Sequence, residues 1–159
     1  MPKIGFGYDI HRLGAGPRLV LGGTEIPFAS GLIGHSDGDA LVHALIDALL
    51  GAVGEGDIGT HFPDTDPRYK GARSLVLLET VMDLVRRRGA AVVNVDTVIV
   101  AEEPRMGPHI PAMKAALAPV LGIPETAVGI KAKTNEGLGP VGEQRAIACL
   151  AVVLVDLSV

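Results

Sequence analysis

The 159-residue chain has little of what several classes of protein require. Its one cysteine, Cys149, cannot close a disulfide within the chain, so nothing calls for an oxidising compartment. Three phenylalanines, two tyrosines and no tryptophan are too few for the aromatic platform on which single-stranded nucleic acid stacks. Fourteen Lys and Arg against eighteen Asp and Glu leave a net charge of −4. General binding to nucleic acid or membrane surfaces is therefore disfavoured, because such partners attract a cationic field.

Long apolar runs are also missing. The longest extends from Ala146 to Val155, about half of the ~20 residues that a membrane-spanning helix needs. The first residues, Met1 to Gly7, lack the apolar core of a signal peptide. A cytoplasmic protein is predicted. The length and an apolar content of 48% fit one domain, which we expect over residues 1–159.

Three helices are predicted from the spacing of apolar residues. The first begins after an N-cap at Ser36 and ends near Gly51 or Gly54. The other two are expected over 74–88 and 108–121, each followed by a glycine.

Strands are predicted where short β-branched or apolar runs are bounded by turn residues. These segments are 3–8, 19–21, 25–27, 92–100, 128–133 and 145–157. The last is apolar at nearly every position, so both of its faces should be buried. The pattern predicts an α+β fold, a mixed sheet with helices on one face, and an oligomer that covers the other face.

Asp9 and His11 are candidate metal ligands. They are two residues apart, so on an extended strand both side chains leave the same face. A carboxylate oxygen and an imidazole nitrogen at that spacing can bind one divalent cation. A hydrogen-bonded pair at a strand end explains the same spacing.

Asp39, His43 and Asp47 follow one another at i, i+4 and i+8 on a helix that is otherwise apolar. Such a helix is buried, so this stripe faces a polar cavity, unless it is a solvated face with Asp–His pairs. If the stripe faces a cavity, His43 can be a third metal ligand beside Asp9 and His11. Three ligands with an open fourth position are the catalytic form of a zinc site. Asp39 and Asp47 would then orient the ligands through hydrogen bonds.

Three loops carry further polar groups. Residues 34–39 precede the first helix, where backbone amides and the helix dipole favour an anionic oxygen, although capping alone explains the composition. The acidic segment 57–67 suits sugar hydroxyls, or simply forms Asx turns. The Lys, Thr and Glu residues of 131–139 suit a phosphate, and Glu136 offers an oxygen ligand to Mg²⁺.

Together these motifs resemble the 2-C-methyl-D-erythritol 2,4-cyclodiphosphate synthase family of the non-mevalonate isoprenoid pathway. The resemblance covers essentially the whole chain. It rests on Asp9-Ile10-His11, the run 35–39, His43, and the segments 56–59, 62–67, 108–111 and 131–136.

The resemblance implies a lyase that converts 4-diphosphocytidyl-2-C-methyl-D-erythritol 2-phosphate to the 2,4-cyclodiphosphate and CMP. It also implies a homotrimer, packed around a β core, with active sites between subunits. One Zn²⁺ per subunit would be held by Asp9, His11 and His43, and Mg²⁺ or Mn²⁺ would bind Glu136 together with the substrate.

The resemblance further assigns His35 and Thr134 to stabilisation of the transition state. Around the metal, the ribose and the methylerythritol, the implied substrate-binding residues are Asp9, Ile10, His11, His35, Ser36, Asp57, Ile58, Gly59, Phe62, Pro63, Asp64, Thr65 and Asp66. On the cytidine side, contributed by a neighbouring subunit, they are Ala101, Glu102, Glu103, Pro104, Arg105, Met106, Gly107, Ala132 and Lys133, and the set is completed by Thr134, Asn135 and Glu136.

Two other functions fit the same residues. A metal-dependent phosphohydrolase would use Asp9, His11 and His43 to activate water. A non-catalytic trimeric protein would only bind the metal or nucleotide. The reaction products separate the three hypotheses.

Overall fold

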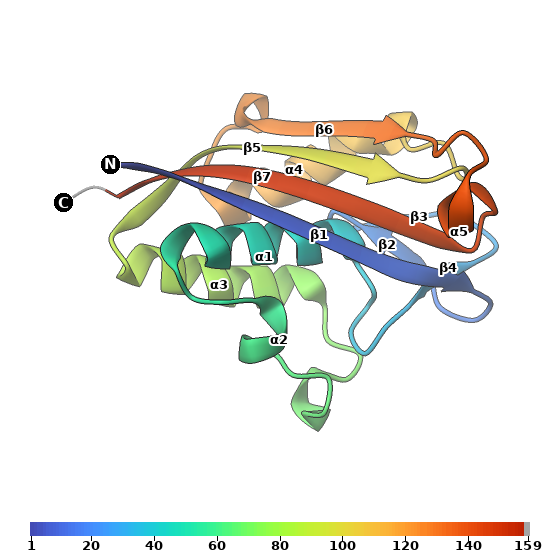
Figure 1. The fold of residues 1–159 in the computed structure, drawn as a ribbon, viewed down its shortest axis with the longest axis horizontal. Helices are drawn as coiled ribbons and strands as arrows, with labels where there is room; N and C mark the ends of the chain where they lie inside the picture. The colour runs from blue at the N-terminus through green and yellow to red at the C-terminus, as the bar shows by residue number, and fades with distance from the viewer. Residues whose placement is uncertain (158–159) are drawn as a thin grey trace.

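The computed structural model describes residues 1–157, which form a mixed five-stranded sheet and a separate hairpin (Figure 1). The sheet order is β4-β1-β7-β5-β6, and only the β5–β6 pair is parallel. The sheet strands are β1 (Pro2–Gly14), β4 (Gly31–Ile33), β5 (Ala90–Val100), β6 (Val128–Lys133) and β7 (Ala146–Leu157). The hairpin strands are β2 (Leu19–Leu21) and β3 (Thr24–Ile26).

The long helices lie on one side of the sheet, where their apolar residues form the core (Figure 1). The helices are α1 (Ala40–Val53), α2 (Ile58–His61), α3 (Ser74–Arg87), α4 (Ile110–Leu121) and α5 (Gly139–Gly142). Short 3₁₀ turns are η1 (Pro67–Tyr69), η2 (Gly107–His109) and η3 (Glu125–Ala127). The α+β class and the mixed sheet are therefore confirmed, and the three predicted helices lie on one face, whereas the four-residue α5 packs against the other face through Val141. None of the helices in residues 1–157 has the length and apolarity that a bilayer crossing requires.

Two glycines on the inner face of β1 let α1 lie directly on that strand. A Cβ atom on Gly5 would be 1.7 Å from the carbonyl oxygen of Ala48, and one on Gly7 would be 1.9 Å from that of Ala44. Side chains alternate along a strand, so the next two inward positions of β1 also face α1. The close approach thus brings the Asp-x-His motif beside the helix.

The outer face of the same sheet is apolar and largely uncovered in the single chain, except at one end, where Val141 of α5 packs against Ala146 and Ala148 of β7. The exposed fractions along β1 are 72% for Ile4, 62% for Phe6, 51% for Tyr8 and 43% for Ile10. Phe6 pairs across the sheet with Val152 of β7, which is 43% exposed. The expectation that both faces of 145–157 are buried is thus met along the helix side, and on the outer side at Ala146 and Ala148, while Val152 on that side stays exposed because one chain supplies no second layer there.

The first helix begins later than expected. Ser36 is not its N-cap: Asp39 fills that role, and its side chain accepts a hydrogen bond of 3.0 Å from the Val42 amide. Gly38, with φ of +73°, turns the chain just before this cap. The helix ends at the left-handed Gly54, one of the two expected ends.

The strand expected over 3–8 extends to Gly14, because the inward polar residues that follow continue the same alternation. The remaining predicted elements agree with the structure to within two residues, and β2 and β6 agree at both ends. The short elements β4, α2 and α5 were not predicted.

Candidate metal centre and substrate cavity

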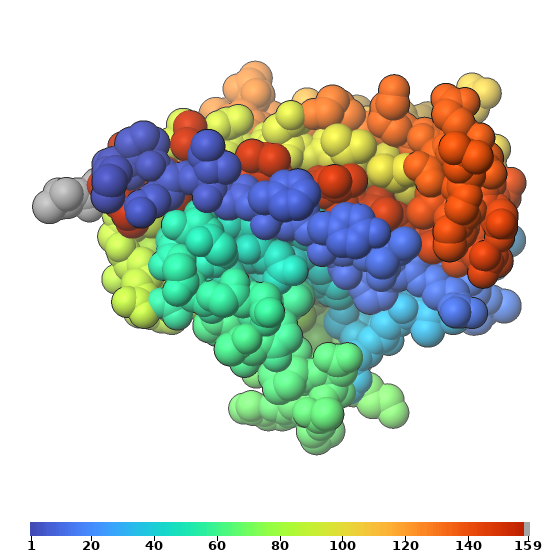
Figure 2. Space-filling view, viewed as in Figure 1, coloured from blue at the N-terminus to red at the C-terminus, as the bar shows by residue number. Residues whose placement is uncertain are grey.

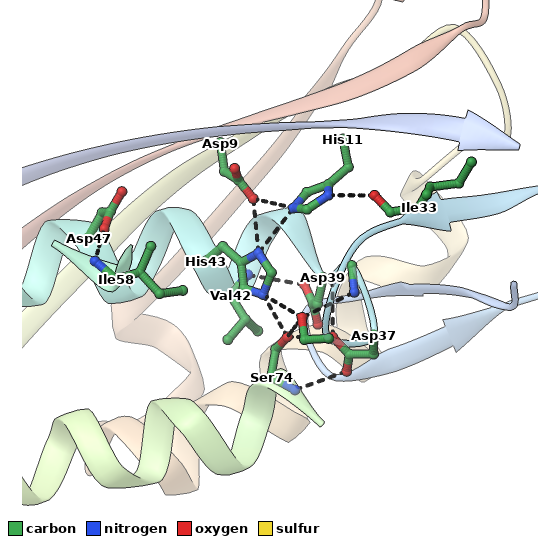
Figure 3. A network of polar contacts seen from close by, with 12 residues as sticks. Asp9, His11, Ile33, Asp37, Asp39, Val42, His43, Asp47, Ile58 and Ser74 are labelled. Atoms are coloured by element: carbon green, nitrogen blue, oxygen red, sulfur yellow. Dashed lines mark hydrogen bonds and ion pairs between the residues drawn. The ribbon is translucent and has the colours of Figure 1, made fainter. Parts of the chain in front are cut away.

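Asp9 and His11 from β1 meet His43 from α1 beneath the sheet (Figure 3). The Asp9 Oδ2 atom lies 2.8 Å from His11 Nε2 and 3.0 Å from His43 Nδ1. The two histidine nitrogens are 3.1 Å apart. Three donor atoms therefore surround one point, as the metal-binding interpretation requires.

Hydrogen bonds on the far side of each ring determine which ring nitrogen is available to a cation at that point. His11 Nδ1 lies 2.9 Å from the carbonyl oxygen of Ile33, to which it can only donate. His43 Nε2 lies 2.8 Å from Ser74 Oγ and 3.1 Å from Ser36 Oγ. With a proton on each of these nitrogens, His11 Nε2 and His43 Nδ1 are free to coordinate a cation.

The donor set fits a zinc ion. Bonds of about 2.0–2.1 Å in tetrahedral geometry separate the ligand atoms by about 3.3 Å. The observed separations of 2.8, 3.0 and 3.1 Å need to widen by only a few tenths of an ångström. One carboxylate and two imidazoles suit Zn²⁺, and three protein ligands leave a position for an oxygen of a bound molecule.

The protonation of the ligands is mutually dependent. Burial raises the pKa of Asp9, but hydrogen bonds and charge from His11 and His43 outweigh burial and hold this pKa below its ordinary value. The hydrogen bond to Asp9 raises the pKa of His11, against the opposite effect of burial. A negative carboxylate thus stabilises positive charge at this point, which a divalent cation can supply in place of the proton.

Asp39 and Asp47 do not orient the ligands, contrary to expectation. The fully buried Asp39 carboxylate accepts hydrogen bonds from the amides of Gly22 (2.9 Å) and Gly23 (2.7 Å), so it joins the β2–β3 hairpin to α1. Burial raises the pKa of Asp39 to about 6. Asp47 accepts a hydrogen bond of 2.7 Å from the Ile58 amide and thereby anchors α2 (Figure 3).

The sequence did not indicate two residues that support His43: Ser74 contacts it directly, and Asp37 contacts it through Ser74. Ser74 is hydrogen-bonded to His43, and Asp37 in turn is hydrogen-bonded to Ser74 (Figure 3). Asp37 lies in the expected loop 34–39, but no local spacing links it to Ser74.

A cavity of about 200 Å³ opens beside these three candidate metal ligands. Figure 2 shows the hollow between the protruding segment that carries α2 and η1, drawn in green, and the rest of the chain. The lining residues are Asp9, His11, His35, Ser36, His43, Ile58, Gly59, Phe62, Asp64, Tyr69 and Leu77. Tyr69 and Leu77 were not predicted. The Tyr69 ring meets the Phe62 ring edge-on, with centroids 5.2 Å apart, so an apolar wall stands opposite the polar ligands.

The remaining predicted residues near this cavity have other positions. Ile10 points to the outer sheet face, opposite the metal ligands. Asp57 accepts a hydrogen bond of 2.9 Å from the Thr60 amide and caps α2. Asp66 caps η1, and its carbonyl oxygen lies 2.9 Å from His35 Nε2. The acidic segment 57–67 therefore forms the expected Asx-type caps, and part of it also lines the cavity. Pro63 and Thr65 belong to it without lining the cavity.

A second cavity, of about 520 Å³, shares no lining residue with the first. Its lining residues are Ala101, Glu102, Pro104, Arg105, Met106, Gly107, Pro108, Ile110, Ala132, Lys133 and Thr134. Glu103 lies in the same loop without lining the cavity. The exposed Asn135 and Glu136 follow, in a turn whose amides at Asn135 and Gly137 donate to the Glu102 carboxylate at 2.8 and 3.2 Å. Within one chain, Thr134 and Glu136 are thus not gathered with the metal ligands.

Known proteins resemble this chain over nearly its whole length. A family model, described as the YgbB family, matches residues 2–156. The 2-C-methyl-D-erythritol 2,4-cyclodiphosphate synthase of Gloeobacter violaceus is 58% identical over 154 residues, covering 97% of this chain and 94% of the relative. A solved synthase of the same name, in a CDP-bound form, is 45% identical, with a TM-score of 0.89, 97% coverage of this chain and 100% of that one. The bifunctional IspDF from Campylobacter jejuni gives a TM-score of 0.95 at 39% identity, and the match covers 99% of this chain and 43% of that longer one.

Proposed function

This chain belongs to the YgbB family, and on that premise we propose that it converts 4-diphosphocytidyl-2-C-methyl-D-erythritol 2-phosphate to 2-C-methyl-D-erythritol 2,4-cyclodiphosphate and CMP. It is a cyclising, CMP-releasing lyase of isoprenoid precursor biosynthesis. The observation that carries the proposal is the convergence of Asp9, His11 and His43 beside a cavity of about 200 Å³.

The chemistry needs positioning and neutralisation of charge more than a nucleophilic side chain. The 2-phosphate of the substrate is already ionised at neutral pH and attacks the β-phosphorus, breaking its bond to the oxygen that leaves with CMP. When bound, Zn²⁺ at the three ligands and Mg²⁺ or Mn²⁺ at Glu136 supply positive charge to the phosphate oxygens.

The residues of the chain hold the substrate in place for this step. His35 and Ser36 present polar atoms on the cavity wall, where they contact the reacting phosphates. Ile58, Phe62 and Leu77 form the apolar part of that wall and exclude water around the methylerythritol carbon chain. Gly59 and Asp64, the other residues of 57–66 on the cavity wall, contact the hydroxyl groups of the substrate.

We propose that the active site is completed between subunits of a homotrimer. The exposed apolar row on β1, together with Val152, supports burial of the outer sheet face against other copies of the chain. The division of the candidate site into two cavities supports the same assembly. A neighbouring subunit would bring the cytidine-binding cavity, Thr134 and Glu136 to the metal centre, with Thr134 stabilising the transition state. The protein would act as one domain over residues 1–159, in the cytoplasm, where its charged small-molecule substrate is retained.

The deciding experiment incubates the purified protein with the cytidyl substrate, Zn²⁺ and Mg²⁺ and follows the products by ³¹P NMR. Stoichiometric CMP and the cyclic diphosphate are expected. A linear monophosphate would indicate a phosphohydrolase instead. No turnover in the presence of both metals would indicate a protein that only binds metal or nucleotide.

A further inference from the structure

Behind the candidate metal centre, a partly buried chain of hydrogen bonds runs from His43 through Ser74, at the start of α3, to Asp37 (Figure 3). His43 Nε2 lies 2.8 Å from the hydroxyl oxygen of Ser74, and the Ser74 hydroxyl is hydrogen-bonded to a carboxylate oxygen of Asp37. Ser74 is completely buried. Its hydroxyl is therefore inaccessible to solvent and forms hydrogen bonds to His43 and Asp37 instead of to water.

The direction of every hydrogen bond in this chain is fixed by chemistry. A carboxylate only accepts, so the Ser74 hydroxyl donates to Asp37. The Ser74 oxygen is then an acceptor for His43, which places a proton on His43 Nε2. The other ring nitrogen, Nδ1, lies 3.0 Å from Asp9 Oδ2 and 3.1 Å from His11 Nε2, so it is the nitrogen that can offer its lone pair to a cation bound at that point.

Asp37 is itself held firmly. One carboxylate oxygen accepts a 3.0 Å hydrogen bond from the Ser74 amide, and the other accepts one of 3.1 Å from the Asp39 amide. Its own amide donates to the carbonyl oxygen of Ala72 at 3.0 Å. Arg73, at the N-cap position of α3, makes no side-chain capping bond, so Asp37 caps this helix from another segment.

Ser36 provides a weaker second contact to the same nitrogen. Its hydroxyl oxygen lies 3.1 Å from His43 Nε2 and 3.3 Å from Ser74 Oγ, and it lines the substrate cavity. A bound substrate can therefore compete for Ser36. The completely buried Ser74 is the permanent partner.

We propose that Ser74 and Asp37 are positioning residues for metal binding, acting as one relay that fixes the tautomer and ring orientation of His43. The inference rests on the proposed metal site. Outer hydrogen-bond partners of metal ligands typically contribute 10–100-fold to affinity, and we expect a loss of about that size when the relay is broken.

The test measures Zn²⁺ dissociation constants by competition with a chromophoric chelator. The proteins compared are the wild type, Ser74→Ala, Asp37→Ala, the double variant and Thr80→Ala. Thr80 lies on the same helix, and its exposed hydroxyl bonds only to the Val76 carbonyl of that helix, so its variant should bind zinc like the wild type. Thermal unfolding of each metal-free protein selects the folded variants for comparison.

Each single relay variant should bind Zn²⁺ about 10–100-fold more weakly than the wild type. The double variant should lose little more than either single one, because both changes break the same chain of hydrogen bonds. Additive losses, or single variants within about threefold of the wild type, would overturn the relay. If Ser74→Ala does not fold, Asp37→Ala, which removes the acceptor of the Ser74 hydroxyl, decides alone. A wild-type protein that binds no zinc would overturn the metal site itself, which is distinguishable from loss of the relay.

Discussion

The contact between β1 and α1 can be tested by replacing Gly7 with alanine. The added Cβ would lie 1.9 Å from the carbonyl oxygen of Ala44 and 2.9 Å from the amide nitrogen of Ala48, whereas ordinary contacts begin near 3.4 Å. Both atoms belong to the backbone and cannot rotate away. The strand and the helix must therefore separate locally by about 1.5 Å.

This separation should affect both stability and metal binding. Forced overpacking costs about 1–3 kcal/mol, and we expect the upper end because backbone atoms are displaced. About 3 kcal/mol lowers the Tm of a protein of this size by roughly 6–12 °C. Metal–ligand distances tolerate only about 0.2 Å of change, so moving His43 away from Asp9 should weaken Zn²⁺ binding by at least about 100-fold.

Thermal unfolding of the metal-free protein and chelator competition measure the two effects. The matched control is Gly51→Ala on the same helix, where a Cβ meets nothing within 4 Å. Alanine favours a helix over glycine by up to about 1 kcal/mol, so this control should unfold at the wild-type temperature or above and bind zinc normally. A Gly7→Ala protein with wild-type Tm and zinc affinity would refute the argument that this close approach sets the metal centre.

Three further predictions concern individual side chains. His43→Ala should lower bound zinc from one equivalent to nearly none after dialysis, because two ligands remain; elemental analysis measures this. Glu136→Gln should retain zinc but lose about 100-fold or more of its Mg²⁺-dependent turnover, since a proposed ligand of the second ion is removed; unchanged activity at every Mg²⁺ concentration would contradict that role. Because the pKa of His11 is raised in the folded protein, protonated His11 stabilises the metal-free fold. This stabilisation is complete below pH 6.5, the ordinary pKa of histidine, and is lost as the pH rises through the raised pKa. The Tm difference between the metal-free wild type and His11→Asn should thus shrink between pH 6 and pH 9, and a constant difference would contradict the assignment.

The convergence of Asp9, His11 and His43 was predictable because the alternation of a strand and the repeat of a helix meet there. Alternation along β1 placed Asp9 and His11 on one face, and the apolar helix left His43 as a polar side chain that needed a partner. The same i, i+4, i+8 spacing led to the wrong prediction that Asp39 and Asp47 orient the metal ligands. Spacing shows which face of a helix a side chain occupies, but it does not show its hydrogen-bond partner. Asp39 lies at the helix start, where unsatisfied amides attract its carboxylate.

What the sequence did not reveal depends on contacts between distant segments. Ser74 reaches His43 across 31 positions and Asp37 across 37, and no periodicity carries that information. The elements α2 and β4 contain four and three residues, too few to show a repeat. The choice of Asp39 over Ser36 as N-cap follows from Gly38, whose left-handed conformation keeps the helix from starting earlier.

The alternation of β1 also limits how this protein can be altered. Odd-numbered positions from Gly5 to His11 face α1, while even-numbered positions from Ile4 to Ile10 form the apolar outer row. Inserting or deleting one residue within this stretch would exchange the two sets, pressing aromatic rings against the helix and turning the Asp-x-His pair outward. An engineer can therefore redesign the outer row by substitution at even positions alone, whereas the length of the strand admits no change.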